Sequence, residues 1–378
     1  VLVGETIVRA GPYAPAAFLI SAIVMGFTAA SFAELSGRVP RAAGEAVYVE
    51  HAFGIGWLTV VVGLAVLAEA MIAAAAIAVG SAGYVAELIA LPRELLVICI
   101  VLLMAMIAAW GIRESVAIAG AMTLVEVLGL LVIIYFGLAN DPGSLNALPP
   151  ALLPSPTDLP AMSGVLAASM IAFFAFIGFD DVVNLVEEAK NPAKIMPWAI
   201  GITLLTVTVL YILVSFVAAQ NISVEEFGAT SAPVSLLFER LTGLPPLAIT
   251  LVAIIATMNG VVIILIMAAR VAYGMAQEGR LPAWIGAVSP LTQTPLRATV
   301  IVSAIVLVLA IFTPLDTLAE TSSEVILAIF LTINLALVWF KIKKIPTPPG
   351  AFKVSIVFPI LGAVLCLALL IGASLVGS

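Results

Sequence analysis

Charge is scarce in this chain. Only 10% of the residues are Asp, Glu, Lys or Arg, whereas 63% are hydrophobic, and the mean hydropathy is +1.26. A soluble domain carries about 25% charged residues and roughly 45–50% apolar ones. The composition therefore excludes a soluble globular protein. It predicts an integral membrane protein with most of its mass in the bilayer.

The residues that build common chemical sites are also few. His51 is the only histidine, and the two cysteines, Cys99 and Cys366, lie within apolar runs, so a typical zinc site or a disulfide is not expected. A net charge of −7 gives no support to nucleic-acid binding, and no phosphate-binding loop of the G-x-x-x-x-G-K-[ST] type occurs. An aspartyl protease pair and a Ser-His pair also lack suitable residues. We expect no cofactor, no metal, no nucleic-acid partner and no enzymatic activity.

Long apolar runs dominate the sequence instead. A helix needs about 20 apolar residues to cross the roughly 30 Å of bilayer hydrocarbon, and the ten-residue alternating segments of a membrane barrel are not seen. We therefore predict an all-α membrane protein. The predicted segments, numbered one to eleven, are a fragment at 1–8 and helices near 14–34, 55–80, 94–110, 116–138, 162–189, 196–219, 245–276, 298–313, 323–341 and 353–376.

The basic residues set the orientation. With the 34–54 loop in the cytoplasm, alternating the helices places twelve of the fifteen Lys and Arg residues inside. The three outside are Arg9, Arg93 and Arg240. Cytoplasmic loops are enriched in Lys and Arg, so this bias supports both the helix count and the topology. The 139–161 loop has no basic residue and is predicted to lie outside.

Polar residues interrupt the sixth helix. In "FFAFIGFDDVVNLVEEAKNP" (173–192), Asp180, Asn184 and Glu187 recur at helical spacing, and Asp181 and Glu188 are seven residues apart. Such a stripe is too costly to face lipid, so it faces protein or water. The alternative is an ordinary helix end with a solvated acidic face.

Gly178 precedes this stripe by two residues and permits backbone geometry that other residues resist. A helix broken at mid-depth is tolerated only where its backbone lines a cavity or packs in protein. Such breaks indicate substrate sites in secondary transporters.

Two carboxyl groups lie deeper in the membrane. Glu69 in "GLAVLAEAMIAAAAIA" and Glu126 in "AMTLVEVLGLLVII" have apolar neighbours on both sides. Each is a candidate proton carrier, and the two would share a proton if they lie close together. The alternative is a protonated Glu that only bonds a neighbouring helix. Residues 260–272 offer no Ser, Thr, Asp or Glu, which favours a proton over sodium as the coupling ion.

Three longer motifs point to a family. These are "SFAELSGRVPRAAGEAVYV" (31–49), "FFAFIGFDDVVNLVEEAKNPAKIMPWAI" (173–200) and "ARVAYGMAQEGRLPAWIGAVSPLTQTPLRA" (269–298). In order and spacing they resemble the amino acid–polyamine–organocation (APC) superfamily of transporters, from residue 1 to about 341. The resemblance implies a LeuT-like five-plus-five inverted repeat with helices one and six broken. Residues 1–341 would form the core, and 342–378 a cytoplasmic loop plus one additional helix.

The resemblance also implies a substrate site. In that family, backbone amides of a G-x-G turn in the first helix hold the substrate carboxylate. Carbonyls around an F-x-G turn in the sixth helix, matched here by Phe176, Ile177 and Gly178, meet its amino group. Phe179 would act as a gate or lid. Asp180 matches an acid that is linked to proton sensing in related antiporters.

Two features depart from the family pattern. The G-x-G turn would fall just upstream of Val1, so we expect half of the site to lie outside this chain. Several relatives carry a lysine in the fifth helix, where this sequence has Glu126. We hypothesise that Glu126 carries the proton, coupled with Glu69.

A cytoplasmic gate is expected near the charged loops. Its candidate residues are Glu187, Glu188 and Arg270. The alternatives are that Arg270 snorkels or caps its helix, and that "EEAKNP" is a solvated, Pro-terminated loop.

The sequence thus predicts secondary active transport of an amino acid or related amine across the cytoplasmic membrane by alternating access, coupled to protons. The partners are the small-molecule substrate, protons and the lipid bilayer. An exchanger without net proton flow remains open, as does a non-transporting sensor or subunit. The substrate side chain and the oligomeric state remain open too.

Overall fold

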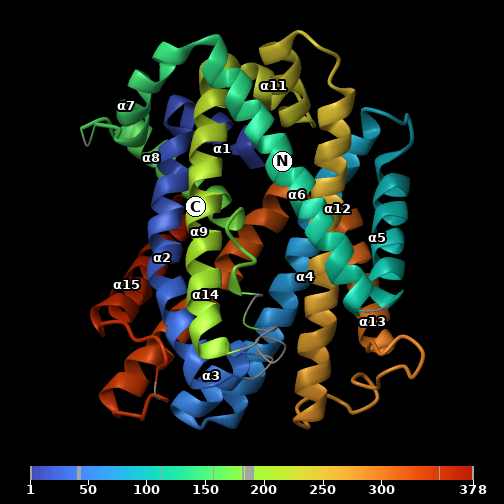
Figure 1. The fold of residues 1–378 in the computed structure, drawn as a ribbon, viewed down its shortest axis with the longest axis vertical. Helices are drawn as coiled ribbons and strands as arrows, with labels where there is room; N and C mark the ends of the chain where they lie inside the picture. Colours follow the sequence, from blue (N-terminus) through green and yellow to red (C-terminus); the bar gives the residue numbers. More distant parts are fainter. Residues whose placement is uncertain are drawn as a thin grey trace.

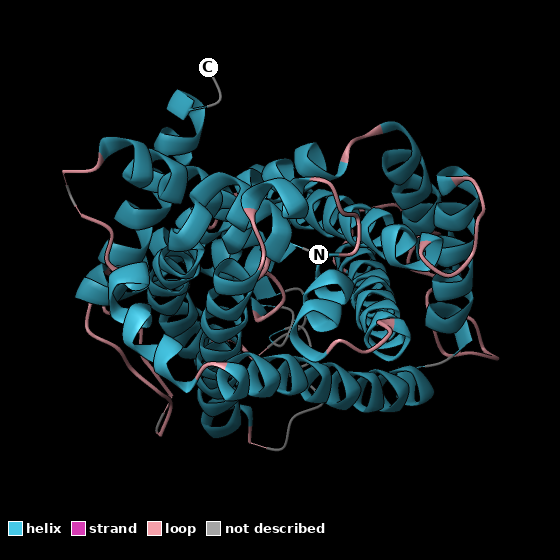
Figure 2. Cartoon of the chain, turned by 90° about the horizontal axis from the view of Figure 1, so that it is seen from above, coloured by secondary structure: helices cyan, strands magenta, loops and turns pink. Residues whose placement is uncertain are grey.

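The computed structural model describes residues 2–40, 44–110, 112–155, 157–180, 183, 191–348 and 350–376. Helices joined by loops and turns make up this described part, which contains no strand (Figures 1 and 2). Seven of its helical segments are long and apolar enough to cross a membrane, and three shorter apolar helices accompany them. The protein is therefore a multi-pass, all-α membrane protein, as the composition predicts.

The helices follow the predicted order. The longer ones are α2 (Ala14–Arg38), α4 (Gly56–Ala86), α5 (Arg93–Trp110), α6 (Ile112–Asn140), α8 (Leu159–Phe174), α9 (Pro192–Asn221), α12 (Leu247–Gln277), α13 (Leu296–Phe312), α14 (Leu315–Ile342) and α15 (Val357–Val376). The shorter ones are α1 (Leu2–Ala10), α3 (Gly44–Phe53), α7 (Leu148–Leu152), α10 (Val224–Gly228), α11 (Pro233–Thr242) and the 3₁₀ helices η1 (Gly11–Tyr13) and η2 (Pro142–Ala147).

Three predicted boundaries are wrong by more than four residues, and one of them is the end of the helix predicted at 55–80, which continues to Ala86. A continuous helix over 162–189 is not observed, because α8 ends at Phe174 and residues 175–179 form turns. The predicted helix at 323–341 begins eight residues earlier, at Leu315, directly after Pro314. Proline cannot donate a hydrogen bond within a helix but is tolerated at its start, so Pro314 sets the point at which α14 begins. The first turns of α14 are more polar than the apolar run that follows, and for this reason the hydropathy pattern missed them.

The 220–244 region was predicted as a loop but contains α10 and α11. Ser223 begins α10 with a capping box: its hydroxyl accepts a hydrogen bond from the Glu226 amide, and the Glu226 carboxylate accepts one from the Ser223 amide. The "SVEE" sequence has the Ser-x-x-Glu spacing of this motif. Gly243 then ends α11 with a φ of 66°.

Small residues allow the central helices to approach closely. α4 packs along α12 and α14, and α2 packs along α9 and α8. The run Ala73–Ala76 on α4 is buried. If Gly137 of α6 were replaced by a larger residue, its Cβ atom would lie only 2.2 Å from Val217 of α9, which is too close. Membrane helices associate largely by such van der Waals packing, which small residues make possible.

The end of the molecule that carries α10 and α11, the predicted outer end, is tightly packed. α11 and α7 lie at one end of the bundle and α3 at the other (Figure 1). A side-chain carbon at Gly4 of α1 would lie 3.3 Å from Pro233, and one at Gly83 of α4 would lie 2.9 Å from the Ser231 carbonyl. Arg9 of α1 also forms a 2.5 Å ion pair with Glu320 of α14. The α10–α11 segment and this ion pair thus join α1, α4 and α14.

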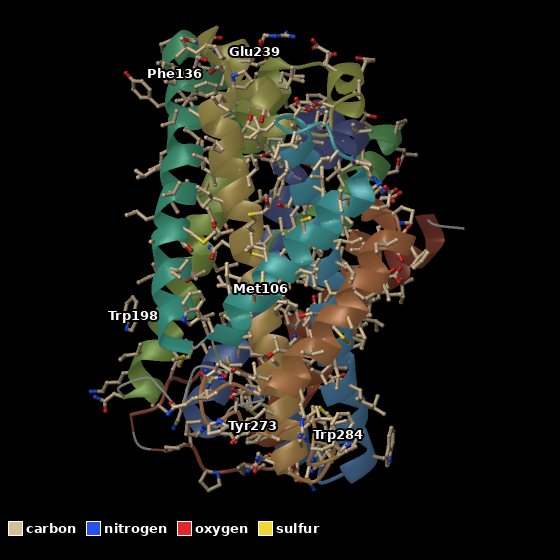
Figure 3. The ribbon with its side chains drawn as sticks, turned by 90° about the vertical axis from the view of Figure 1, so that its right-hand side faces the viewer. Met106, Phe136, Trp198, Glu239, Tyr273 and Trp284 are labelled. Atoms are coloured by element: carbon tan, nitrogen blue, oxygen red, sulfur yellow. The ribbon has the colours of Figure 1, made fainter. Side chains whose placement is uncertain are left out.

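Tryptophan side chains gather toward the opposite end, which is the predicted cytoplasmic one. All five have exposed fractions of at least 39%; four lie in the first or last turns of a helix, and Trp284 lies in the loop after α12. They are Trp57, Trp110, Trp198, Trp284 and Trp339. Trp198, Tyr273 and Trp284 lie toward one end of the bundle, and Phe136 and Glu239 toward the other (Figure 3). Tryptophan favours the membrane–water interface on either side of the bilayer, so this placement marks one interface and does not itself set the orientation.

Candidate functional site

The break in α8 is a tight turn with an acidic side chain folded onto it. After Phe174 the chain continues in turns, in which the Phe176 and Ile177 amides each donate to the carbonyl three residues back, those of Phe173 and Phe174. Gly178 then has a φ of 116°, a value that L-residues with a side chain rarely adopt. The Oδ1 atom of Asp180 accepts a hydrogen bond from the Gly178 amide at 3.0 Å. Asp180 is buried, and its carboxylate holds the turn.

Two aromatic clusters hold the turn against the surrounding helices. The Phe176 ring lies 6.4 Å from Phe18 of α2 and 5.5 Å from Tyr211 of α9. The Phe179 ring lies 5.6 Å from Phe32 of α2 and 5.5 Å from Phe330 of α14. Such centroid separations and tilted geometries are favourable for aromatic pairs. The turn is thus seated between α2, α9 and α14, with Phe179 closed into the protein. Ile177 between them is half-buried and packs against two separate clusters of buried hydrophobic residues.

Glu126 joins α6 to α12. Its Oε1 atom accepts a hydrogen bond at 2.7 Å from the Nδ2 atom of Asn259, which also donates to Thr123 at 3.1 Å. The Oδ1 atom of Asn259 is buried and has no hydrogen-bond partner among the described residues. α6, which carries Glu126, also packs against α9. Tyr211 of α9 packs on Phe176, so the helix of Glu126 is linked to the turn through α9.

Glu69 contacts a different helix. Its Oε1 atom accepts a 2.8 Å hydrogen bond from Ser322 of α14, and both residues are buried. Glu126 and Glu69 thus bind polar partners on α12 and α14 respectively. A proton shared between the two carboxyl groups stays a prediction.

The cytoplasmic gate candidates are only partly described. Glu187 and Glu188 lie outside the described residues, as do Asp181 and Asn184. Arg270 is half-buried near the cytoplasmic end of α12. A hollow of about 500 Å³ is lined by Glu50, His51, Glu278 and Arg280, of which the last two follow Arg270 in the sequence. This hollow is lined by polar residues of α3 and the loop after α12, so it is separate from the turn after α8.

The geometry is that of a broken membrane helix with buried carboxyl groups around it, and the described residues contain no cluster of three His, Cys, Asp or Glu that could hold a metal. The family described as "Amino acid permease" matches residues 2–378. The chain belongs to the amino acid permease family. It is a transporter of this family, and not an enzyme.

Curated relatives of this permease carry related but different names. The chain is 28% identical to the branched-chain amino acid permease BcaP of Bacillus subtilis, over 98% of this chain and 83% of that protein. It is 30% identical to the vacuolar cationic amino acid transporter 4 of Arabidopsis thaliana, over 85% of this chain and 56% of that protein. It is 28% identical to a methylthioribose transporter of Bacillus subtilis, over 95% of this chain and 80% of that protein.

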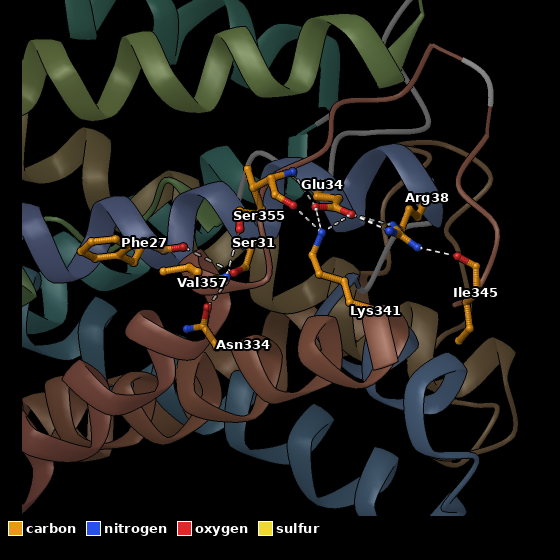
Figure 4. Close-up of polar contacts among 10 residues, drawn as sticks. Phe27, Ser31, Glu34, Arg38, Asn334, Lys341, Ile345, Ser355 and Val357 are labelled. Carbon is orange, nitrogen blue, oxygen red and sulfur yellow. Dashed lines mark hydrogen bonds and ion pairs between the residues drawn. The ribbon is translucent and has the colours of Figure 1, made fainter. Parts of the chain in front are cut away.

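Sequence reasoning missed a buried ionic cluster of the permease. Glu34 of α2 is fully buried, and its carboxylate accepts hydrogen bonds from Arg38 at 2.5 Å, from Lys341 of α14 at 2.7 Å and from the Val354 amide at 2.8 Å. Lys341 also donates to the Val354 carbonyl at 2.6 Å, and Arg38 donates to the Ile345 carbonyl at 2.9 Å. Figure 4 shows this "Glu34 cluster". It ties α2, α14 and the segment before α15 together.

A second polar contact lies one turn deeper between the same helices. Ser31 of α2 donates to Asn334 of α14 at 2.6 Å (Figure 4). Asn334 also donates to Thr28 at 2.9 Å. The spacing of Thr28, Ser31 and Glu34 is three residues, which places them on one face of a helix. This periodicity, which runs from Thr28 into the first motif at Ser31 and Glu34, was the available signal for a polar face of α2.

Proposed function

We propose that this permease carries an amino acid or a related amine across the cell membrane by alternating access, and that proton binding drives the cycle. The observation that carries the proposal is the turn after Phe174, where Gly178 adopts a φ of 116° and is bonded by Asp180. A membrane helix that ends at mid-depth presents backbone dipoles to a bound polar molecule. The amino acid permease family membership agrees with this role.

In the proposed site, carbonyl groups of Phe176, Ile177 and Gly178 bind the substrate amino group. Phe179 closes over the substrate, and its packing on Phe32 and Phe330 represents the closed position of this lid. Asp180 controls the turn, because protonation of its carboxylate would weaken the hydrogen bond from the Gly178 amide. The same acid would thus respond to protons and shape the binding site.

Glu126 is the proposed proton carrier. When it is ionised, Asn259 donates to it, and its charge lies on α6, which packs against α9 and so against the helix of Tyr211. When Glu126 is protonated, that charge is lost and its carboxyl group gains a hydroxyl donor. After a rotation of the Asn259 amide, the unpartnered Oδ1 atom of Asn259 can accept a hydrogen bond from this hydroxyl. Two protonation states then favour two arrangements of α6, α9 and α12.

Glu69 is proposed to act in the same cycle from the other side of the bundle. Its bond to Ser322 is made to α14, the helix that also carries Glu320 of the outer ion pair and Phe330 of the lid cluster. Opening of the outer end must break the Arg9–Glu320 pair. A change in the protonation of Glu69 would therefore act on the helix that closes both ends.

The cytoplasmic gate is proposed to include Glu187, Glu188 and Arg270. In the sequence, Glu187 and Glu188 follow the turn, and Arg270 precedes the end of α12 by seven residues. The contacts of α11 with α1 and of Arg9 with Glu320 at the other end support an opening at this end.

The proposal is tested with the full-length protein in proteoliposomes. Uptake of radiolabelled amino acids, first branched-chain and then cationic ones, is measured with and without an imposed inward proton gradient. We expect the gradient to stimulate uptake in the wild type but not in Glu126→Gln. Glu225→Gln, which changes an exposed acid of α10, is the matched control and should respond as the wild type does.

Each alternative gives a different result in this assay. Exchange that needs internal substrate and ignores the gradient would indicate an exchanger without net proton flow. Substrate binding without flux would indicate a sensor or subunit. A full gradient response in Glu126→Gln would exclude Glu126 as the proton carrier.

A further inference from the structure

The linker between α14 and α15 has an unusual charge balance. We call residues 343–356 the strap, and the structure describes all of them except residue 349. The protein has a net charge of −7, yet no Asp or Glu follows Glu324, and four lysines do. Lys341 belongs to the Glu34 cluster. Lys343, Lys344 and Lys353 are exposed, so the strap presents only positive charge.

The backbone of the strap is fixed to the transport helices. The Val354 amide donates to Glu34 at 2.8 Å, and the Val354 carbonyl accepts from Lys341 at 2.6 Å. Arg38 bonds the Ile345 carbonyl at 2.9 Å. None of these contacts uses the three exposed lysines, which project from a segment that α2 and α14 hold in place.

Apolar side chains accompany the exposed lysines. Phe352 is 41% exposed and Val357, at the start of α15, is 52% exposed. The Lys343 ammonium lies 4.9 Å from the centre of the exposed Trp339 ring. A soluble anion site would not need apolar side chains of this kind, whereas a segment that lies in the membrane–water interface combines basic with aromatic and aliphatic residues.

We propose that the strap is a binding surface for anionic phospholipid headgroups of the cytoplasmic leaflet. Both flanking helices enter the membrane at this end, so the lysines lie at headgroup level. Basic residues beside a membrane helix attract anionic lipid, and salt weakens this attraction. The apolar side chains of Phe352 and Val357 then contact the acyl-chain region.

Headgroup binding at the strap also affects transport. The strap is bonded through Glu34 to α2 and through Lys341 to α14. These two helices carry Phe32 and Phe330, which pack on Phe179 of the turn. Anionic lipid therefore stabilises one arrangement of α2 and α14, and the transport rate depends on the lipid composition of the inner leaflet.

The binding test compares Lys343→Gln/Lys353→Gln with Lys194→Gln/Arg297→Gln. The second pair removes two exposed cytoplasmic basic residues outside the strap. Phosphatidylglycerol and phosphatidylcholine are titrated onto the full-length protein in detergent, and bound lipid is counted by native mass spectrometry. Each lysine near the surface is worth about fivefold in affinity. The strap variant should therefore bind phosphatidylglycerol about 25-fold more weakly, while the control variant keeps the wild-type preference.

Two results would overturn the proposal. One is an unchanged preference for phosphatidylglycerol in the strap variant, and the other is an equal loss in the control variant. Glycerol phosphate is added as a soluble competitor. Failure of this competitor to displace the lipid is expected, and full displacement would indicate an anion site in place of a lipid surface.

Transport gives an independent readout. Wild-type uptake into liposomes that contain phosphatidylglycerol should exceed uptake into pure phosphatidylcholine, and high salt should reduce the difference. The strap variant should transport at the same rate in both, with an unchanged melting temperature. A wild-type lipid response in the strap variant would refute the coupling. The lipid-binding arm does not depend on which substrate is carried, so it remains valid if the proposed function fails.

Discussion

Replacing Glu34 with Gln should destabilise the protein more than any single change in its partners. The carboxylate is fully buried, and five hydrogen bonds end on it, from Arg38, Lys341 and the Val354 amide. Gln keeps the shape but not the charge. Two cations then face each other, with side-chain exposures of 6% for Arg38 and 14% for Lys341. Removing one member of a buried pair costs about 3–5 kcal/mol, and we expect Glu34→Gln to fall in this range.

Lys341→Met should be milder. Glu34 keeps the two Arg38 contacts, at 2.5 and 3.0 Å, and the protein loses the lysine bonds to Glu34 and the Val354 carbonyl. Hydrogen bonds to charged groups contribute about 1.5–3 kcal/mol each, not additively. We expect a loss of about 2–3 kcal/mol. In the double variant one of the two facing cations is gone, so the loss should be clearly smaller than the sum of the two single losses.

The assay is equilibrium unfolding of the purified protein in mixed micelles, followed by circular dichroism. A double-mutant cycle then gives the interaction energy between Glu34 and Lys341. Strict additivity would refute the reasoning, because it would mean that the two groups do not interact. So would a Glu34→Gln variant within about 1 kcal/mol of the wild type, or a Lys341→Met variant that is less stable than Glu34→Gln.

Three further predictions concern Gly178 in the turn, Glu226 in the capping box of α10, and the ion pair between Arg9 and Glu320. Gly178→Ala forces a side chain onto a φ of 116° and should lower the stability by about 1–3 kcal/mol and abolish uptake. The control Gly201→Ala, on the exposed face of α9, should leave the stability unchanged or raise it. Equal uptake by the two variants would contradict this prediction. Backbone bonding at Ser223 and the charge of Arg240 lower the pKa of Glu226 below its usual 4.5. The ionised Glu226 therefore stabilises α10 above pH 4.5, and this stabilisation is lost as the pH falls through the lower pKa of the folded state. Hydrogen exchange of the α10 amides should accordingly become faster only in strong acid. Arg9→Gln should weaken outer closure and speed labelling of a cysteine placed at residue 4 from outside; unchanged labelling would exclude a gating role for the ion pair with Glu320.

Much of the fold follows from the sequence because apolar run length sets membrane helices. The helices α4, α6 and α12 lie where their runs lie, and Gly178 marks the break after α8. The helical 220–244 region was not predicted, because α10 and α11 are short and depend on local capping at Ser223 rather than on a long apolar run.

The partners of the buried acids could not be predicted in the same way. Glu34 lies close to a charged loop, so it reads as a solvated residue, and its partner Lys341 is 307 positions away. Likewise, the bond between Glu126 and Asn259 spans 133 positions. Such contacts depend on how helices pack, and apolar periodicity does not encode which polar residues meet across an interface. The sequence could therefore identify the acids but not their bonds.

The one-sided placement of the tryptophans has a practical consequence for spectroscopy. All five tryptophans are at least 39% exposed and lie toward the end that the basic residues predict to be cytoplasmic, so the tryptophan fluorescence of the protein is expected to originate from that face alone. A brominated lipid confined to the inner leaflet would quench the emission, and the same lipid in the outer leaflet would leave it almost unchanged. The unmodified protein thus reports its own insertion direction in a vesicle.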